Sequence, residues 1–520
     1  MTSQAALSLL TAVMARRAIA GLLLYGCACL AAAQPYVIDS GFNQGQWFLD
    51  AFAGSAAQDY AGHRIARLSD GGSVVAGVVP GTAGKPALGL VRHGSTGERQ
   101  TWLTPGEFGH YGNQYVIYPV PFGATDDVLD LVRYGERLFV LAHGWKYRFS
   151  TQPPFEPRFA GHTVEVLVFG TDGSLRQRQI VDEDDNVDTR RALAGGIAVY
   201  ADDAGSISSP VSLVYGGTRI DGVTRRATFR RYSVGGDSTL TAATGLVYPN
   251  PGGGACSAGC EINGLRLGSR PGNGIPRIYV AGSYFNGTQW DIAVMQLSAS
   301  GLPTGSFAGD GLQTVGFNLA GGTLHDYGRA LAVTPGSNAS AGNDDRIYVA
   351  ADVAVHCGNA AGVIKLRGDG AADTSFGPGG LGRYYFGGPQ IPSGNICFSP
   401  SADAFARDIA VADGKVAVAG ERKIESIFIG GELQVDGLLA VMNESGVMQS
   451  LDWYPYRESG ERARHAAFHG ITPGGSESFT VTGDVRYFDD AGANAGHTQY
   501  ATLRLAPLRD PIFDDGFQQP

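Results

Sequence analysis

Short runs in which apolar and polar residues alternate recur along nearly the whole chain. In the clearest example, residues 409–411 and 416–418 both alternate, and Asp413-Gly414 lies between them. An Asp-Gly pair between two alternating runs is the strongest short-range signal for a β-hairpin, because both turn positions need a positive φ. Two more apolar runs follow, at Asp436–Met442 and after Gly446. The pattern predicts a unit of four short antiparallel strands.

Units of this kind repeat along the chain. One unit cannot bury both faces of its sheet alone, so several copies must stack around an axis or along a line. We expect seven units, and their first strands begin near His63, Leu129, Arg191, Gly264, Arg329, Ala404 and Arg464.

The last unit lacks a fourth strand, and the N-terminal region carries a strand that belongs to no unit. After Leu505 the chain has prolines in place of a glycine turn and a strand. The segment Tyr36–Leu49, which contains Phe42, is similar to segments that follow the third strand elsewhere, at Pro303–Gly311 and Asp373–Gly380. Pairing the N-terminal segment with the last unit closes a ring and leaves only short, protected edges. The sequence therefore predicts an all-β fold, a seven-bladed β-propeller closed by an N-terminal strand that completes the last blade.

The composition agrees with many short strands joined by tight turns. Glycine accounts for 77 of the 520 residues, and charged residues make up only 17%, as expected of an all-β chain. The formal net charge of −10 argues against a nucleic-acid partner and against adhesion to an anionic membrane surface. Beyond the N-terminal region, no apolar run approaches the ~20 residues that a membrane span needs. We expect a monomer whose partner is an extracellular ligand or protein.

The first 33 residues have the features of a secretory signal peptide. Arg16 and Arg17 precede the apolar run Ala18–Leu30, and the three alanines that follow satisfy the small-residue rule for cleavage. The alternative is a lipoprotein anchored through Cys27, whose preceding residues fit that pattern poorly. We expect a secreted or periplasmic protein with three parts: a signal peptide (1–33), a propeller (34–510) and a C-terminal tail (511–520).

Four cysteines remain after removal of the signal peptide. They are Cys256, Cys260, Cys357 and Cys397, and an even number in an oxidising compartment indicates two disulfides, for which three connectivities exist. Cys256 with Cys260 would close a glycine-rich loop, and Cys357 with Cys397 would tie a strand edge to the next long loop. A zinc site is the alternative, but no second close pair or nearby histidine completes it.

Two stretches resemble a known family of repeats. Residues 409–420 read Ile-Ala-Val-Ala-Asp-Gly-Lys-Val-Ala-Val-Ala-Gly, and residues 366–380 combine an Asp-Gly turn with Asp-Thr-Ser-Phe-Gly-Pro-Gly-Gly. Both look like the delta-60 repeat of secreted bacterial proteins, and the resemblance covers most of the mature chain. It implies a propeller fold and an exported setting, and it brings no catalytic motif to transfer.

An arginine recurs near the start of the first strand in five units. These residues are Arg64, Arg191, Arg329, Arg407 and Arg464, and Asp59, Asp188, Asp326 or Asp403 often precedes them. If the first strands are innermost, five guanidinium groups at one channel mouth would form a site for a carboxylate or phosphate. The alternative is that each arginine pairs with its preceding aspartate or with loop carbonyls and only holds neighbouring blades together.

A weak calcium candidate lies in an acidic run. Asp184, Asn186 and Asp188 have the opening spacing of a calcium loop, but Thr189 stands where glycine is expected and no glutamate closes the loop. A solvated turn is the alternative, and we expect no other cofactor.

Motifs for catalysis are missing from the sequence. It has no Gly-x-Ser-x-Gly, no His-Glu-x-x-His and no phosphate-binding Gly-Lys-Ser/Thr. His143, His325, His465 and His469 lack an evident partner, so we interpret them as ordinary strand and loop residues. The leading hypothesis is an exported, non-catalytic propeller that binds a ligand on one face of the ring. The alternative is a secreted carbohydrate-active enzyme, a lyase or glycosidase, with its site at the mouth of the central channel, because one propeller fold hosts many chemistries.

Overall fold

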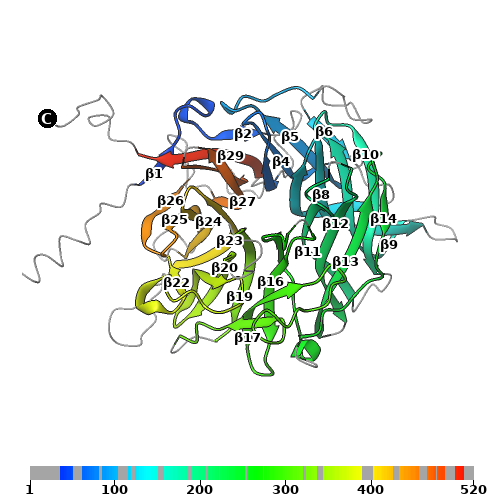
Figure 1. The fold of residues 1–520 in the computed structure, drawn as a ribbon. Coiled ribbons are helices and arrows are strands. Elements are labelled where there is room, and N and C mark those ends of the chain that lie inside the picture. The colour runs from blue at the N-terminus through cyan, green and yellow to red at the C-terminus, as the bar shows by residue number, and fades with distance from the viewer. Residues whose placement is uncertain are drawn as a thin grey trace, which may run out of the picture.

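The computed structural model contains seven antiparallel β-sheets arranged as blades around one axis (Figure 1). The first strands of neighbouring blades contact one another in an unbroken cycle, β3, β7, β11, β15, β19, β23, β27 and back to β3. The predicted seven-bladed propeller is therefore confirmed. The structure describes residues 35–50, 61–80, 85–102, 115–118, 123–149, 157–184, 190–206, 208–221, 223–251, 255–272, 274–319, 324–336, 344–388, 402–425, 433–455, 465–475, 477–486 and 498–508.

Each blade has its first strand at the axis and its later strands further out. Blade 1 contains β3 (Ala61–Arg67), β4 (Ser73–Pro80), β5 (Pro86–His93) and β6 (Tyr115–Tyr118). Blade 2 contains β7 (Gly123–Tyr134), β8 (Arg137–Phe149), β9 (Pro157–Gly170) and β10 (Leu175–Asp184). Blade 3 contains β11 (Arg190–Ala201), β12 (Val211–Asp221), β13 (Thr224–Val234) and β14 (Leu240–Ala242). Blade 4 contains β15 (Gly264–Leu267), β16 (Ile278–Phe285), β17 (Trp290–Leu297) and β18 (Leu312–Val315).

The last three blades follow the same order. Blade 5 contains β19 (Asp326–Thr334), β20 (Arg346–Val355), β21 (Gly358–Arg367) and β22 (Arg383–Phe386). Blade 6 contains β23 (Ala402–Ala412), β24 (Lys415–Glu425), β25 (Leu433–Asn443) and β26 (Met448–Tyr454). Blade 7 contains β27 (His465–Gly475), β28 (Ser478–Arg486) and β29 (Thr498–Pro507), to which the N-terminal region adds β1 (Tyr36–Ile38) and β2 (Phe48–Asp50). Short 3₁₀ turns occur at η1 (Asn43–Gly45), η5 (Ala255–Ser257) and η6 (Pro378–Gly380).

The N-terminal region supplies the outer edge of blade 7. Val37 in β1 pairs with Ala506, and Leu49 in β2 pairs with Ala501, so both short strands lie along β29. In Figure 1 the blue β1 and β2 lie beside the red β29. The predicted closure by an N-terminal strand is therefore confirmed.

A buried phenylalanine connects each of several blades to the next, and it lies either after the third strand or, in blade 7, in the N-terminal segment beside that strand. Phe42, Phe307 and Phe376 are all buried. The residue after each donates its backbone N–H to the next blade, from Asn43 to Thr96 O, Ala308 to Asp369 O and Gly377 to Ser445 O, at 2.8–2.9 Å. Phe42 thus makes the same contact between blades 7 and 1 that its counterparts make elsewhere. This equivalence explains the sequence similarity that identified the N-terminal segment.

The first strand of most blades contains a β-bulge against the second strand. In β3, for example, Gly62 pairs with Gly77 and Arg64 pairs with Ala76, so His63 is the extra residue. The bulge needs glycine opposite it, since a methyl group at Gly77 would lie 1.9 Å from the Ala61 carbonyl oxygen. The corresponding glycines of other blades, Gly282, Gly420 and Gly483, face carbonyl oxygens at 1.8–2.0 Å in the same way. These glycines end the repeated Val-Ala-Gly or Val-Thr-Gly triplets of the sequence.

The cores lie between neighbouring blades. One buried cluster joins Tyr348 and Phe376 of blade 5 to Leu438 of blade 6, and another joins Leu439 of blade 6 to Phe479 of blade 7. Burial of this apolar surface is the main favourable contribution to folding. In the part of the chain that the structure describes, no helix has the length and apolar character needed to cross a membrane.

One predicted disulfide is present, and the pairing of Cys357 with Cys397 stays a prediction. Cys256 and Cys260 are bonded, with their Cα atoms 5.1 Å apart. Cys357 is disulfide-bonded, but its expected partner, Cys397, lies outside the described residues. The predicted signal peptide (1–33) and the tail (511–520) also lie outside them.

Candidate functional site: the central channel and the seam beside it

The bulges determine which side chains occupy one level of the inner strands. The bulged residue is His63 in blade 1, Arg329 in blade 5, Arg407 in blade 6 and His469 in blade 7. A bulge re-aims a side chain and is over-represented beside functional sites. We call these four residues the bulge ring.

Carboxylates pair with every member of the bulge ring. Matching positions on the second strands carry Asp352, Glu421 and Asp484, which contact Arg329, Arg407 and His469 respectively. Blade 1 has the apolar Val78 at this position. His63 instead contacts Asp127 of blade 2, so its pairing crosses a blade boundary.

The four predicted arginines that lie in the described residues do not occupy equivalent positions. Arg329 and Arg407 are bulge residues, whereas Arg64 follows the bulge and Arg191 pairs with Ile220 well before it. Arg464 lies outside the described residues. The register therefore does not bring all five to one level of the channel.

The described arginine side chains are held within the protein. Arg329 Nε lies 2.7 Å from Asp352 Oδ2, and Arg407 lies 2.5 Å from Glu421 Oε1. Arg64 donates to the carbonyl oxygens of Leu129 at 2.9 Å and His469 at 2.8 Å, and so joins blade 1 to blades 2 and 7. Arg329 and Arg407 thus each pair with a carboxylate of their own blade, which is not the preceding aspartate, whereas the hydrogen bonds of Arg64 join neighbouring blades.

The aspartates that precede the arginines bind backbone groups instead. Asp326 accepts hydrogen bonds from the N–H groups of Phe317 and Ala354, and Asp403 accepts one from Asn359. Asp59 and Asp188 lie outside the described residues.

Burial and charge act in opposite directions on the carboxylates of the bulge ring. Burial raises the pKa of Asp352 above its usual value, although Arg329 and Arg407 oppose the shift. Burial also acts to raise the pKa of Glu421, but Arg407 and the nearby lysine outweigh it, so the net shift is downward. Likewise the pKa of Asp127 is lowered, because the hydrogen bond from His63 outweighs burial.

A charged layer lies just past the bulge ring along the inner strands. Arg266 of blade 4 lies 2.9 Å from Asp130 Oδ2 of blade 2. Between them, blade 3 has Gly196, where a methyl group would lie 3.1 Å from the same oxygen. Asp408 of blade 6 interacts electrostatically with Arg64 and Arg266, yet burial keeps its pKa raised. We call Arg64, Asp130, Arg266 and Asp408 the charged layer.

A cavity of about 430 Å³ extends from the charged layer to the ends of the inner strands. We call it the channel cavity. Six blades contribute to its wall, with Val132, Val333 and Val411 among the apolar residues and Arg67 and Arg133 among the cations. The channel is therefore hollow at this end.

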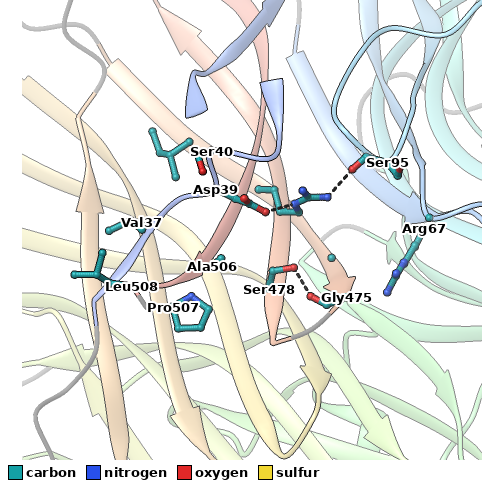
Figure 2. Close-up of a pocket in the computed structure, with 14 residues that line it drawn as sticks. Val37, Asp39, Ser40, Arg67, Ser95, Gly475, Ser478, Ala506, Pro507 and Leu508 are labelled. Carbon is teal, nitrogen blue, oxygen red and sulfur yellow. Dashed lines mark hydrogen bonds and ion pairs between the residues drawn. The ribbon is translucent and has the colours of Figure 1, made fainter. Parts of the chain in front are cut away.

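A second cavity, of about 640 Å³, lies where blade 7 meets blade 1. We call it the seam cleft, and Figure 2 shows its lining. Arg504 in the cleft lies 2.6 Å from Asp39 Oδ2 and donates to the Ser95 carbonyl oxygen at 2.6 Å. Arg504 repeats the role of Lys365 in blade 5, which pairs with Asp373 at 2.9 Å. This part of the cleft is a blade-to-blade joint.

Arg67 lines both cavities. Unlike Arg504, it is not held by an ion pair within the described residues. Its side chain is exposed, and within the described ranges it forms no hydrogen bond or ion pair. Figure 2 shows it across the cleft from Leu508 with no interaction drawn to it. Gly475 leaves room for it, since a methyl group there would lie 2.8 Å from Arg67 Nη2. Arg67 is thus a cation available at the junction of two cavities.

Two histidines lie close together where blade 7 meets blade 1. His469 has a carboxylate partner, Asp484, and its ring centroid lies 5.8 Å from that of His63. The signal in the sequence is the glycine within the second strand, Gly483 in blade 7, because it lies opposite the bulge. The partner of His63 is 64 residues away, and no local pattern reveals it.

Most of the predicted calcium site lies outside the described residues. Asp184 ends β10, while Asn186 and Asp188 lie outside the described residues. Among the residues that are described, no group of three or more His, Cys, Asp or Glu side chains is arranged to hold a metal ion.

Comparison with known proteins finds solved structures that resemble this chain at very low sequence identity. No protein-family model and no curated protein matches the chain. The β-propeller domain of the Trilobed protease from Pyrococcus furiosus is 9% identical over 82% of this chain and 96% of that chain, with a TM-score of 0.34. A mutant α-L-arabinanase from Cellvibrio cellulosa is 10% identical over 63% and 96%, with a TM-score of 0.30. A glycoside hydrolase family 32 protein from Bifidobacterium adolescentis is 10% identical over 90% and 80%, with a TM-score of 0.27. Likenesses this distant carry no conclusion about the site.

Proposed function

We propose that this protein is an exported, non-catalytic propeller that binds a carboxylate-bearing ligand where the channel cavity and the seam cleft open. The observation that carries the proposal is Arg67, an exposed guanidinium without a partner among the described residues, which lines both cavities. A guanidinium binds a carboxylate through two parallel hydrogen bonds. Arg64, from the predicted set, lines the channel cavity behind it. The disulfide and the N-terminal 33 residues support an exported setting.

The competing function is a lyase or glycosidase with its site in the channel cavity. Such an enzyme needs a carboxylate or imidazole with an atom available to the substrate. Asp130 accepts hydrogen bonds from Leu131 and Ile197 and pairs with Arg266. Asp408 accepts hydrogen bonds from Ile409 and Ile471 through its two oxygens. Both acids are committed to the fold, and no histidine is among the described residues that line the channel cavity, so the geometry of this cavity favours binding over catalysis.

Binding of anionic polymers to an Arg67→Ala variant tests the proposal. Oligogalacturonate and poly-glutamate serve as probes, and isothermal titration calorimetry gives the affinity. A charge-assisted hydrogen bond contributes about 1.5–3 kcal/mol, so we expect affinity for the bound probe to fall about tenfold or more. The effect should weaken as salt is added.

Arg176→Ala is the matched control, because Arg176 is a partly exposed arginine of blade 2 that lines neither cavity. It should bind as the unmodified protein does. Equal affinities of the Arg67 and Arg176 variants, or no binding of either probe, would exclude the proposed site.

A further inference from the structure

We propose that His63 and His469 form a binding site for a divalent transition metal such as Zn²⁺. This site is separate from the proposed ligand site, since it lies in the bulge ring, toward the beginning of the inner strands. Blades 1 and 7 each supply one histidine through a bulge at the same level. The two imidazoles therefore meet across the seam at which the ring closes.

Each histidine has one ring nitrogen engaged and the other left for a ligand. Nδ1 of His63 contacts Asp127 Oδ1, and in the tautomer whose Nδ1–H donates to that oxygen the lone pair of Nε2 is left for a metal. The Val128 N–H, which lies 3.2 Å from Nδ1, donates to it only in the other tautomer. Nε2 of His469 contacts Asp484 Oδ1, so Nδ1 is left. Histidines that bind metals almost always have the other ring nitrogen held by a carboxylate or carbonyl, which fixes the tautomer and the ring orientation.

The spacing of the two rings suits a shared ion. Zinc binds histidine nitrogen at roughly 2.0–2.1 Å in near-tetrahedral geometry, which places two imidazole centroids on one ion roughly 5–6 Å apart. The observed centroid distance is 5.8 Å, with the ring planes inclined by 59°. The His63 and His469 side chains are 18% and 27% exposed, so an ion can reach them from solvent.

The local charge also suits a cation. Asp127 and Asp484 contribute two negative charges beside the imidazoles, and the Arg64 guanidinium contributes one positive charge where it binds the His469 carbonyl oxygen. Two histidines are the only protein ligands that the proposal assigns, so solvent would complete the coordination. We therefore expect micromolar affinity rather than the much tighter binding of structural zinc sites with four protein ligands.

Titration of Zn²⁺ into the mature protein, produced without a polyhistidine tag, tests the site. We expect one Zn²⁺ per chain by calorimetry and a saturable visible spectrum when Co²⁺ replaces it. His469→Ala should lower the affinity at least tenfold. Asp484→Asn should lower it about 10- to 100-fold, the usual effect of losing a carboxylate that holds a metal-binding histidine.

His325→Ala is the control, because His325 belongs to blade 5 and its Nδ1 accepts the Trp290 N–H at 3.1 Å. It should bind Zn²⁺ normally. Zn²⁺ should also raise the melting temperature of the unmodified protein, because a ligand that binds only the folded state stabilises it. If His469→Ala fails to fold, His469→Gln replaces it. No saturable binding, or equal affinity in the His469 and His325 variants, would overturn the proposal.

Discussion

At the scale of single residues, glycines on the second strands determine where the inner strands bulge, and so which residue of each inner strand is the extra one. Gly77, Gly420 and Gly483 each allow a carbonyl oxygen of the first strand to approach within 2.0 Å of where a Cβ would lie. That close approach accompanies the bulge, and the bulge presents His63, Arg407 or His469 at one level of the channel. A residue without a side chain therefore determines where the charged side chains lie.

Replacing Gly483 by alanine should destabilise the fold strongly. The added methyl group would lie 1.8 Å from the Ala467 carbonyl oxygen, a backbone atom that cannot turn away. Overpacking of this kind costs about 1–3 kcal/mol or more, and we expect about 3 kcal/mol from urea unfolding. Gly236→Ala is the control, because nothing lies within 4 Å of its added methyl group, and it should change stability by less than about 0.5 kcal/mol. Equal unfolding midpoints for the two variants would refute this account of the bulges.

At the scale of elements, the segment after the third strand acts as a joint between blades. In blade 5, Asp373 starts this segment, pairs with the buried Lys365 at 2.9 Å and is followed by the buried Phe376. Lys365 also donates to the Glu444 carbonyl oxygen of blade 6 at 2.7 Å. Asp39 and Arg504 form the same pair in blade 7, and Arg504 donates to the Ser95 carbonyl oxygen of blade 1 at 2.6 Å. The motif that marks the repeats in the sequence is therefore a contact between blades.

The Asp373 joint should make stability depend on pH. Burial opposes ionisation of Asp373, but hydrogen bonds from Lys365 and Ser375 outweigh it and lower its pKa from 3.8 to about 2. An acid with a lowered pKa in the folded state contributes stability above its unfolded pKa and loses it as pH falls. The contribution is about 2 kcal/mol, complete above about pH 4 and lost toward pH 2. Asp373→Asn should therefore destabilise the protein more at pH 7 than at pH 3 in urea unfolding. The same difference at both pH values would contradict this prediction.

The strands can be predicted from the sequence, whereas the contacts at the site cannot, for a physical reason. Alternating runs and Asp-Gly turns are local signals, and they were enough to predict the strands and the closure at Phe42. The partners of the charged residues are not local. His63 finds its carboxylate 64 residues away, and Arg266 finds Asp130 at a separation of 136 residues. Only the assembled ring brings such groups together, so candidate residues could be named from the sequence but not the partners or the level of each in the channel.

At the scale of the whole molecule, the ring is closed at one junction, where the N-terminal strands join blade 7. Blades 1 to 6 are each built from one continuous stretch of chain, whereas blade 7 joins β27–β29 to β1 and β2 from the N-terminal region. The seam cleft, Arg67 and the pair His63 and His469 all lie where blade 7 meets blade 1. Both proposed sites therefore depend on the same closure.

A disulfide across the closing strands measures that closure most directly. Val37 and Ala506 are direct partners in the β1–β29 pairing, and opposed residues of antiparallel strands have Cα atoms roughly 4.5–5.5 Å apart, within the range for a disulfide. In a Val37→Cys, Ala506→Cys double variant, we predict a nearly complete bond within each chain, seen by mass spectrometry as an N-terminal peptide linked to a C-terminal one. Free thiols, or bonds only between chains, would contradict the closed ring.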